Sequence, residues 1–210
     1  MIKARLGADL DRVVLAVFPF VARLRFKPDT LTVMGVGVSL LAAVAFAADQ
    51  LAWAGVALLV AGFFDLIDGV VARSQGCSGA SGGFFDSSMD RLSDLLIFSG
   101  LAIGMALSGN IWGVLLVCWA LTGSVMTSYT RARAERHLAH FSVGVIERAE
   151  RLVVLIIGSL TGWLEVALWV VAIGASLTTV QRLVVARRLL QELDRTGEDP
   201  TLANVPARVR

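Results

Sequence analysis

The chain has 210 residues, of which 56% are hydrophobic, and its mean hydropathy is +0.74. A single soluble core needs far less apolar surface than this, so we expect apolar helices that face lipid. The net charge is only +2, and no nucleic-acid partner is expected. The two cysteines, Cys77 and Cys118, lie in a Gly/Ser-rich loop and in an apolar stretch, which excludes a disulfide framework and a CxxC metal site.

The N-terminal segment, residues 1–26, mixes charged and apolar residues and lacks the pattern of a cleaved signal peptide. Within residues 9–25 the apolar side chains recur at helical spacing, which predicts an amphipathic helix that lies in the membrane interface. A helix packed on a soluble core is the alternative interpretation.

Six apolar stretches follow, and they approach the roughly 20 residues that a bilayer-spanning helix needs. The first starts after Lys27 with Pro28 and Asp29, residue types that suit the first turn of a helix. We expect several spans to continue into polar cytoplasmic ends. The sequence predicts one all-α integral membrane domain over residues 1–210, with six transmembrane helices, an N-terminal amphipathic interfacial helix and a polar cytoplasmic tail at 193–210. The stretches are residues 31–48, 51–64, 95–107, 111–126, 152–163 and 166–180.

The basic residues are distributed unevenly among the connections. All 19 Lys and Arg lie before the first span, between spans two and three, between spans four and five, or after span six. The connections near Asp49, Asn110 and Glu165 carry none. Because Lys and Arg in short loops favour the cytoplasmic side, we expect a multi-pass protein of the cell membrane with both termini in the cytoplasm.

Four aspartates occupy the expected cytoplasmic ends of spans two and three: Asp65, Asp68, Asp86 and Asp90. Ionised carboxylates at membrane depth are costly, so they should face a polar cavity and meet a counter-charge. The first two are spaced i, i+3 and the last two i, i+4, so each pair shares one face of its helix. The short link SQGCSGASGG, residues 74–83, folds the two faces together.

Converging carboxylates repel one another unless a multivalent cation lies among them, and an all-oxygen shell favours magnesium, with manganese as an alternative. Such an ion predicts a phosphate-bearing substrate. Gly69, Gly82 and Gly83 permit close approach of a ligand, and Arg73 offers a bidentate donor to phosphate. The alternative is a structural charge network with Arg73 and Arg91, in which four acids would outnumber two arginines.

The pattern Asp65-x2-Asp68-Gly69-x2-Ala72-Arg73-x8-Gly82-x3-Asp86-x3-Asp90 resembles, at every fixed position, the signature of the CDP-alcohol phosphotransferase family. The start of span one, with Pro28, Asp29 and Thr32, and the six-span organisation also resemble that family.

This resemblance implies that Asp65, Asp68 and Asp86 ligate the metal, and that Asp90 completes the cluster and acts as the catalytic base. It implies in-line displacement at the lipid-side phosphorus of a CDP-diacylglycerol-type lipid, with release of CMP, by a homodimeric enzyme. The residues implied in CDP binding are Pro28, Asp29, Thr32, Asp65, Asp68, Gly69, Ala72, Arg73, Gly82 and Asp86.

A second polar group lies at the expected cytoplasmic ends of spans four, five and six. Several guanidinium groups suit a phosphorylated polyol acceptor better than a neutral one. The alternative is that these arginines obey the positive-inside rule and meet anionic membrane lipid. Residues spaced i, i+2 on a helix cannot point the same way, and this applies to two of the arginines. The group is Ser128, Arg131, Arg133, Arg151 and Arg182.

Residues 128–135, 144–151 and 181–182 resemble the phosphatidylinositol phosphate synthase branch of the family, which implies inositol phosphate as acceptor and the same five residues as its pocket. The chain departs from that branch in having Arg131 where Lys is usual and Ala149 where Pro is usual. A phosphatidylglycerophosphate synthase that uses glycerol 3-phosphate stays open, as does an ether-linked lipid donor. From another class, acids within spans also occur in membrane ion transporters.

Overall fold

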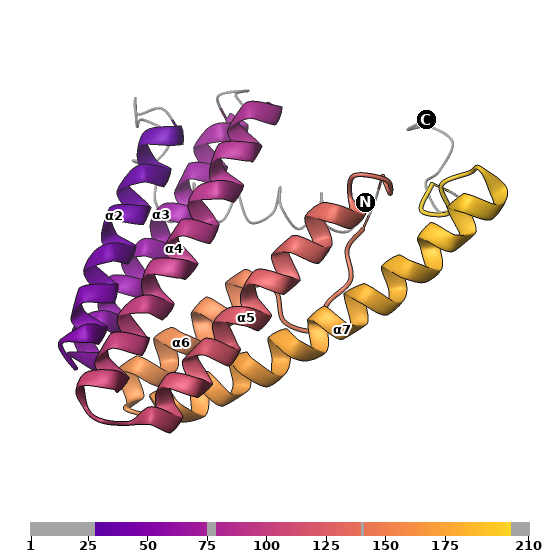
Figure 1. Cartoon of the computed structure of the whole chain (residues 1–210). Helices are drawn as coiled ribbons and strands as arrows, with labels where there is room; N and C mark the ends of the chain where they lie inside the picture. The colour runs from indigo at the N-terminus through magenta and orange to yellow at the C-terminus, as the bar shows by residue number, and fades with distance from the viewer. Residues whose placement is uncertain (1–27, 75–78, 140, 203–210) are drawn as a thin grey trace. The chain divides into compact units, whose positions relative to one another are not determined.

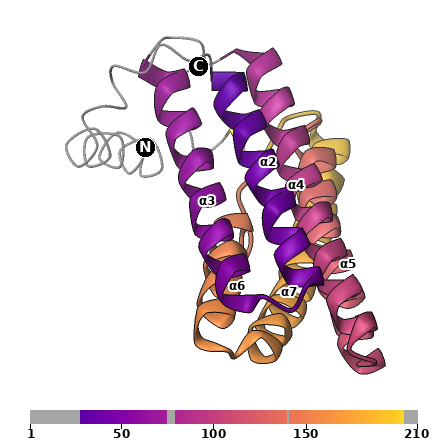
Figure 2. The ribbon, with the colours of Figure 1, turned by 90° about the vertical axis from the view of Figure 1, so that its left-hand side faces the viewer.

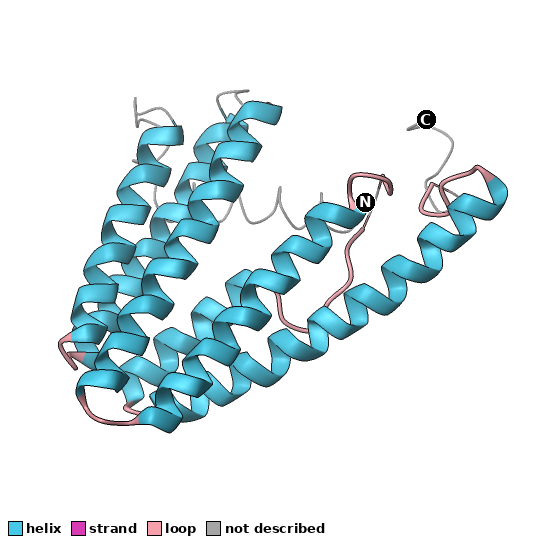
Figure 3. Cartoon of the chain, viewed as in Figure 1, coloured by secondary structure: helices cyan, strands magenta, loops and turns pink. Residues whose placement is uncertain are grey.

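The computed structural model describes residues 28–74, 79–139 and 141–202, and every regular element among them is an α-helix (Figures 1 and 3). The all-α class is therefore confirmed, whereas the amphipathic helix expected within residues 1–26 lies outside the described residues. The helices are α2 (Pro28–Ala47), α3 (Leu51–Ser74), α4 (Ala80–Leu107), α5 (Ile111–Ala134), α6 (Arg148–Thr161) and α7 (Leu164–Thr196).

In the described part of the chain, four helices are long and apolar enough to cross a membrane: α2, α3, α5 and α7. Helix α4 has 28 residues, but its first half carries charged side chains, and α6 has only 14 residues. At 1.5 Å per residue α6 is about 21 Å long, less than the roughly 30 Å of a hydrocarbon core. The helices indicate a membrane protein, and four of the six expected spans meet these criteria.

The helix ends differ from the limits of the apolar stretches. Helix α3 continues to Ser74 and α4 starts at Ala80, so the polar ends expected for spans two and three are helical. Helix α7 runs through Thr196, past the start of the tail predicted at 193, because residues 193–196 still make helical hydrogen bonds. It ends at Gly197, whose φ of 71° is a left-handed conformation that glycine adopts without strain.

The first of two compact units contains α2, α3 and α4 as far as Gly104. Helices α2 and α3 lie side by side (Figures 1 and 2). Gly100 and Gly104 of α4 approach the backbone of Ala43 and Phe46 in α2 so closely that a Cβ atom at either glycine would collide with it. Small residues at a helix crossing permit such close packing. The buried cluster beside the polar helix ends consists of Leu31, Ile67, Val70 and Val71.

The second compact unit begins at Met105, and in it α5 and α6 both pack against α7. Gly123 of α5 lies against Ala175 of α7, and Gly158 of α6 lies against Ala167 of α7. A side-chain hydrogen bond also joins α5 to α7, because Trp119 Nε1 donates to Ser176 Oγ at 2.9 Å. These contacts fix the three helices that carry the predicted acceptor residues.

Candidate metal and phosphate site

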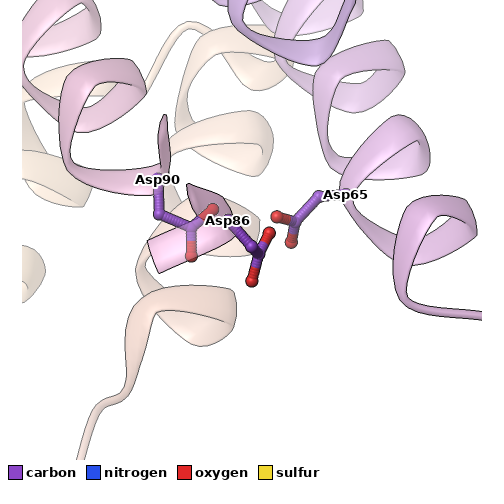
Figure 4. A group of neighbouring side chains, drawn as sticks. All are labelled: Asp65, Asp86 and Asp90. Atoms are coloured by element: carbon purple, nitrogen blue, oxygen red, sulfur yellow. The ribbon is translucent and has the colours of Figure 1, made fainter. Parts of the chain in front are cut away.

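Three of the four predicted metal ligands converge in the first unit. Asp65 projects from α3 and Asp86 and Asp90 project from α4, and one carboxylate oxygen from each lies within 4.8 Å of the others (Figure 4). Asp65 is exposed, whereas the other two are half-buried. The i, i+4 spacing of Asp86 and Asp90 places both on one face of α4, so a single facing helix completes the group.

The donor set of this group fits a hard divalent cation. Three carboxylates supply only oxygen ligands, and at this separation their charges repel one another unless a cation offsets them. Arg91 lies at the edge of the group, with Nη1 4.0 Å from Asp90 Oδ2, and its side chain is 40% exposed. An exposed ion pair of this length contributes little, so Arg91 does not replace a metal ion.

The fourth predicted ligand, Asp68, is held differently. It is buried, with 5% of its surface exposed, and its Oδ2 accepts a hydrogen bond from Thr32 Oγ1 at 2.7 Å. Asp68 is not a member of the three-carboxylate group. The bond to Thr32 of α2 fixes the orientation of a carboxylate that would otherwise be costly to bury.

A cavity of about 690 Å³ opens beside these acids, and every residue predicted to bind metal or CDP lines it. Two further lining residues are Gly79, which no prediction included, and Gly83, where the sequence indicated only close approach of a ligand. A Cβ atom at either glycine would meet no described atom within 4 Å, so there is open space beside the first turn of α4. The lining residues are Pro28, Asp29, Thr32, Asp65, Asp68, Gly69, Ala72, Arg73, Gly79, Gly82, Gly83, Asp86 and Asp90.

Gly69 and Arg73 are one helical turn apart on α3 and act together. A Cβ atom at Gly69 would lie 3.2 Å from Arg73 Nη1, so the guanidinium folds back over the glycine. Because Gly69 has no side chain, the Arg73 guanidinium can lie there, along the cavity wall. A guanidinium opposite a set of carboxylates suits a phosphate that also contacts a metal ion.

The second unit brings together three of the five predicted acceptor residues. Arg151 of α6 and Arg182 of α7 are each only 3% exposed. Both donate to Thr127 of α5: Arg151 Nη1 to its Oγ1 at 3.2 Å, and Arg182 Nη1 to its carbonyl oxygen at 2.7 Å. Arg182 Nε also donates to the carbonyl of Val143 at 2.6 Å. Two buried cations are thus positioned by neutral oxygens of the fold.

The third arginine, Arg131, joins this group through a carboxylate that the sequence did not indicate. Glu147 Oε1 lies 3.8 Å from Arg131 Nη1 and 3.6 Å from Arg182 Nη2. Arg131 also donates through Nε to Glu135 at 2.7 Å. The signal that could have drawn attention to Glu147 is the Glu147-x-x-Glu150 spacing before an apolar run, which is a form of capping box.

Arg133 and Ser128 are not linked to this group by any contact that fixes their side chains. Arg133 is exposed, and Ser128 is half-buried on α5. The helical spacing that separates Arg133 from Arg131 accounts for their different surroundings. An acceptor role for these two residues stays a prediction.

The sequence matches known proteins over most of its length. A family model described as CDP-alcohol phosphatidyltransferase matches residues 25–181. The archaetidylinositol phosphate synthase of Pyrococcus horikoshii is 37% identical over 81% of this chain and 88% of its own length. The phosphatidylinositol phosphate synthase of Streptomyces avermitilis is 35% identical over 89% of this chain and 83% of its own length.

The fold matches a solved enzyme as well. The crystal structure of Mycobacterium tuberculosis phosphatidylinositol phosphate synthase with CDP-DAG bound superposes with a TM-score of 0.71 at 28% identity, covering 87% of this chain and 94% of that one. The same enzyme in complex with manganese and citrate gives a TM-score of 0.70, also at 28% identity, over 86% of this chain and 88% of that one. These matches agree with divalent-metal use and with a transferase rather than an ion transporter. The chain belongs to the CDP-alcohol phosphatidyltransferase family.

Proposed function

We propose that this enzyme transfers a phosphatidyl group, or its ether-lipid counterpart, from a CDP-linked lipid to a hydroxyl of inositol phosphate, and that it releases CMP. The observation that carries the donor half is the cavity, since the metal and CDP positions taken from the family pattern line one space of about 690 Å³. The relatives support the acceptor half, because both are named for synthesis of an inositol phosphate lipid.

Magnesium is the metal we propose, with Asp65, Asp68, Asp86 and Asp90 as the residues that hold it. When bound, the ion offsets charge on the diphosphate and polarises the phosphoryl group under attack. The three clustered carboxylates provide an oxygen site for it, and Thr32 keeps Asp68 oriented beside them. Arg73, over Gly69, contributes a donor to a phosphate oxygen.

Asp90 is the proposed general base. In the reaction the acceptor hydroxyl oxygen forms a bond to the lipid-side phosphorus, while the bond from that phosphorus to the CMP oxygen breaks. The hydroxyl proton passes to the Asp90 carboxylate, and CMP leaves as the anion. Asp90 is half-buried at the group's edge on α4, an environment in which a carboxylate can exchange protons with a bound ligand.

We propose that Arg131, Arg151 and Arg182 bind the phosphate of the acceptor, with Ser128 and Arg133 as further candidates. The convergence of the first three on Thr127 and Glu147 supports this proposal. Glycerol 3-phosphate also carries a phosphate and a hydroxyl, and only the relatives' names favour inositol phosphate over it.

The proposed topology has six transmembrane helices, an interfacial N-terminal helix, both termini in the cytoplasm and a homodimeric assembly in the cell membrane. Three strongly exposed tryptophans agree with this topology. Trp53, Trp112 and Trp163 are 70%, 81% and 70% exposed. Each lies beside one of the three connections that lack Lys and Arg. Tryptophan is enriched at the membrane–water interface, so these positions agree with the charge distribution.

The test is CMP release by the purified full-length protein in detergent, with each acceptor supplied separately. With magnesium and a CDP-lipid we expect release with inositol phosphate, and none above background with inositol or serine. Ester-linked and ether-linked donors are compared in parallel to assign the lipid chains. If serine or free inositol alone supports release, the proposed acceptor class is wrong.

Metal binding is tested without activity by thermal unfolding. Manganese or magnesium should raise the Tm of the wild-type protein, since a ligand at about 100 times its Kd stabilises by about 2.7 kcal/mol. Asp86→Asn should lose most of this increase, while Arg133→Gln should retain it. An equal increase in Asp86→Asn would place the metal elsewhere.

A further inference from the structure

Glu147 occupies a position that the proposed reaction does not yet explain. Its Oε1 lies within ion-pair distance of Arg182 and Arg131, at 3.6 and 3.8 Å. Both separations exceed the roughly 2.7–2.9 Å of a charge-assisted hydrogen bond. The Glu147 side chain is 37% exposed, so solutes can reach it. Glu147 thus offsets the charge of two cations at a place where an anion is proposed to bind.

The backbone around Glu147 is held by hydrogen bonds that do not involve the arginines. Thr178 Oγ1 of α7 accepts hydrogen bonds from the N–H groups of Val145 and Ile146, at 3.2 and 3.0 Å. Glu147 is the N-cap of α6, and its own N–H donates to Glu150 Oε2 at 2.9 Å in a reciprocal capping box. The Glu147 side chain also accepts a hydrogen bond from the backbone N–H of Glu150 in this capping box. The loop and the helix end can therefore stay in place when a phosphate replaces the carboxylate at the guanidinium groups.

The same loop also positions one of the arginines. A Cβ atom at Gly144 would lie 2.8 Å from Thr178 Cγ2 and 3.1 Å from Arg182 Nη2, so the glycine permits the close approach. Val143 accepts from Arg182 Nε at 2.6 Å. Arg182 is thus held through Nε and Nη1, and its Nη2 is the nitrogen that faces Glu147.

A phosphate group is a better partner for these cations than one carboxylate. It carries up to two charges and three acceptor oxygens, and guanidinium groups bind it in a bidentate manner. We propose that Glu147 is a specificity-determining residue whose carboxylate competes with the acceptor's phosphate for Arg131 and Arg182. This inference rests on the proposed acceptor site. It implies that a neutral polyol binds poorly, because such a polyol has no charge to replace that of Glu147.

The test uses Glu147→Gln, which removes the charge and keeps an acceptor oxygen for the helix cap. Exposed ion pairs are individually weak, so we expect the Kd of inorganic phosphate to fall about three- to tenfold in this variant. The Kd is measured by calorimetry on full-length protein in detergent with magnesium present, and Arg131→Gln supplies the weak-binding baseline. The KM of inositol phosphate should fall by a similar factor, while the KM of the CDP-lipid stays unchanged.

The matched control is Glu150→Gln, which removes the same charge from the same helix end and keeps the bond to the Glu147 N–H. It should leave the phosphate Kd within about twofold of the wild-type value. The inference is overturned if the phosphate Kd of Glu147→Gln is unchanged or higher than the wild-type value. It is also overturned if the phosphate Kd falls equally in both variants.

The outcomes also separate this inference from the proposed function. Tighter phosphate binding in Glu147→Gln, in a protein that does not use inositol phosphate, supports the role of Glu147 and rejects the proposed acceptor. If the protein uses inositol phosphate but Glu147→Gln changes neither the phosphate Kd nor the acceptor KM, the proposed acceptor is supported and the role of Glu147 is rejected.

Discussion

The aspartate cavity and the arginine cluster solve opposite electrostatic problems. In the first unit, one oxygen from each of three carboxylates lies within 4.8 Å of the others, and like charges at that distance repel one another. In the second unit, Arg131, Arg151 and Arg182 are positioned by a threonine, a loop carbonyl and Glu147, all from the chain itself. We propose that the cavity balances its charge with a metal ion, whereas the cluster carries its own counter-ion and exchanges it for the phosphate of the acceptor.

The largest effect on activity is expected from a substitution of Asp90 in the aspartate cavity. Asp90→Asn should lower kcat by a factor of about 10² to 10⁴, because a general base contributes that much and the amide cannot take a proton. The control is Asp94→Asn, one turn further along α4 and outside both the cavity lining and the carboxylate group. The measurement is CMP release at saturating substrates, with the Tm recorded for each variant. Wild-type kcat in Asp90→Asn would remove it from the role of base.

The next largest effect is expected in the arginine cluster. Arg131→Gln should raise the KM of the acceptor about 10- to 100-fold, since a hydrogen bond to a charged group is worth about 1.5–3 kcal/mol. The KM of the CDP-lipid should change little. Arg133→Gln, two residues along the same helix, tests the remaining sequence prediction, and we expect a smaller effect because Arg133 is exposed. Equal increases in both KM values would argue against a dedicated acceptor cluster.

A smaller effect is expected at the bond that orients Asp68. Thr32→Val removes the donor at 2.7 Å and leaves a buried carboxylate with one fewer partner, a loss of about 1–3 kcal/mol. We expect kcat/KM for the CDP-lipid to fall about tenfold, and Thr32→Ser, which keeps the hydroxyl, to stay near the wild-type value. A Thr32→Ser variant as impaired as Thr32→Val would indicate that packing, rather than the hydrogen bond, is what matters.

The smallest effect concerns the loop beside Arg182. Gly144→Ala places a Cβ atom against Thr178 and Arg182, so the loop must shift by a few tenths of an ångström. We expect the acceptor KM to rise about threefold, about 0.7 kcal/mol, and the Tm to fall by a few degrees. Gly37→Ala in α2, where a Cβ atom meets nothing within 4 Å, is the control for an added Cβ atom that makes no steric contact. An unchanged acceptor KM in Gly144→Ala would separate the loop from the cluster.

The convergence of the aspartates could be expected because each pair shares one helix face, whereas the cavity beside them is lined by α2 as well as by α3 and α4. Spacings of i, i+3 and i, i+4 determine which acids share a face, and Asp65 of α3 meets Asp86 and Asp90 of α4. The exception is Asp68, whose partner Thr32 comes from α2 and depends on how three helices pack. Hydropathy alone locates only the apolar part of each helix, but the expected continuation of spans two and three into polar ends agrees with α3, which ends at Ser74, and α4, which begins at Ala80.

The arginine side was less predictable for a physical reason. Arg151 and Arg182 are joined through Thr127, and the three residues come from three helices with no shared local spacing. Glu147 was missed because its partners lie far along the chain, and only the capping spacing with Glu150 is visible locally. Residue spacing predicts which side chains share a face of one helix. Contacts between side chains of different helices can be identified only from the three-dimensional structure.

The most direct measurement of the central claim is a competition experiment read by mass spectrometry. Wild-type protein, magnesium and a CDP-lipid are incubated with equal concentrations of inositol phosphate, glycerol 3-phosphate, inositol and serine. The account predicts one dominant lipid product, the inositol phosphate lipid, formed in equal amount to the CMP released. A dominant glycerophosphate or serine lipid would contradict it.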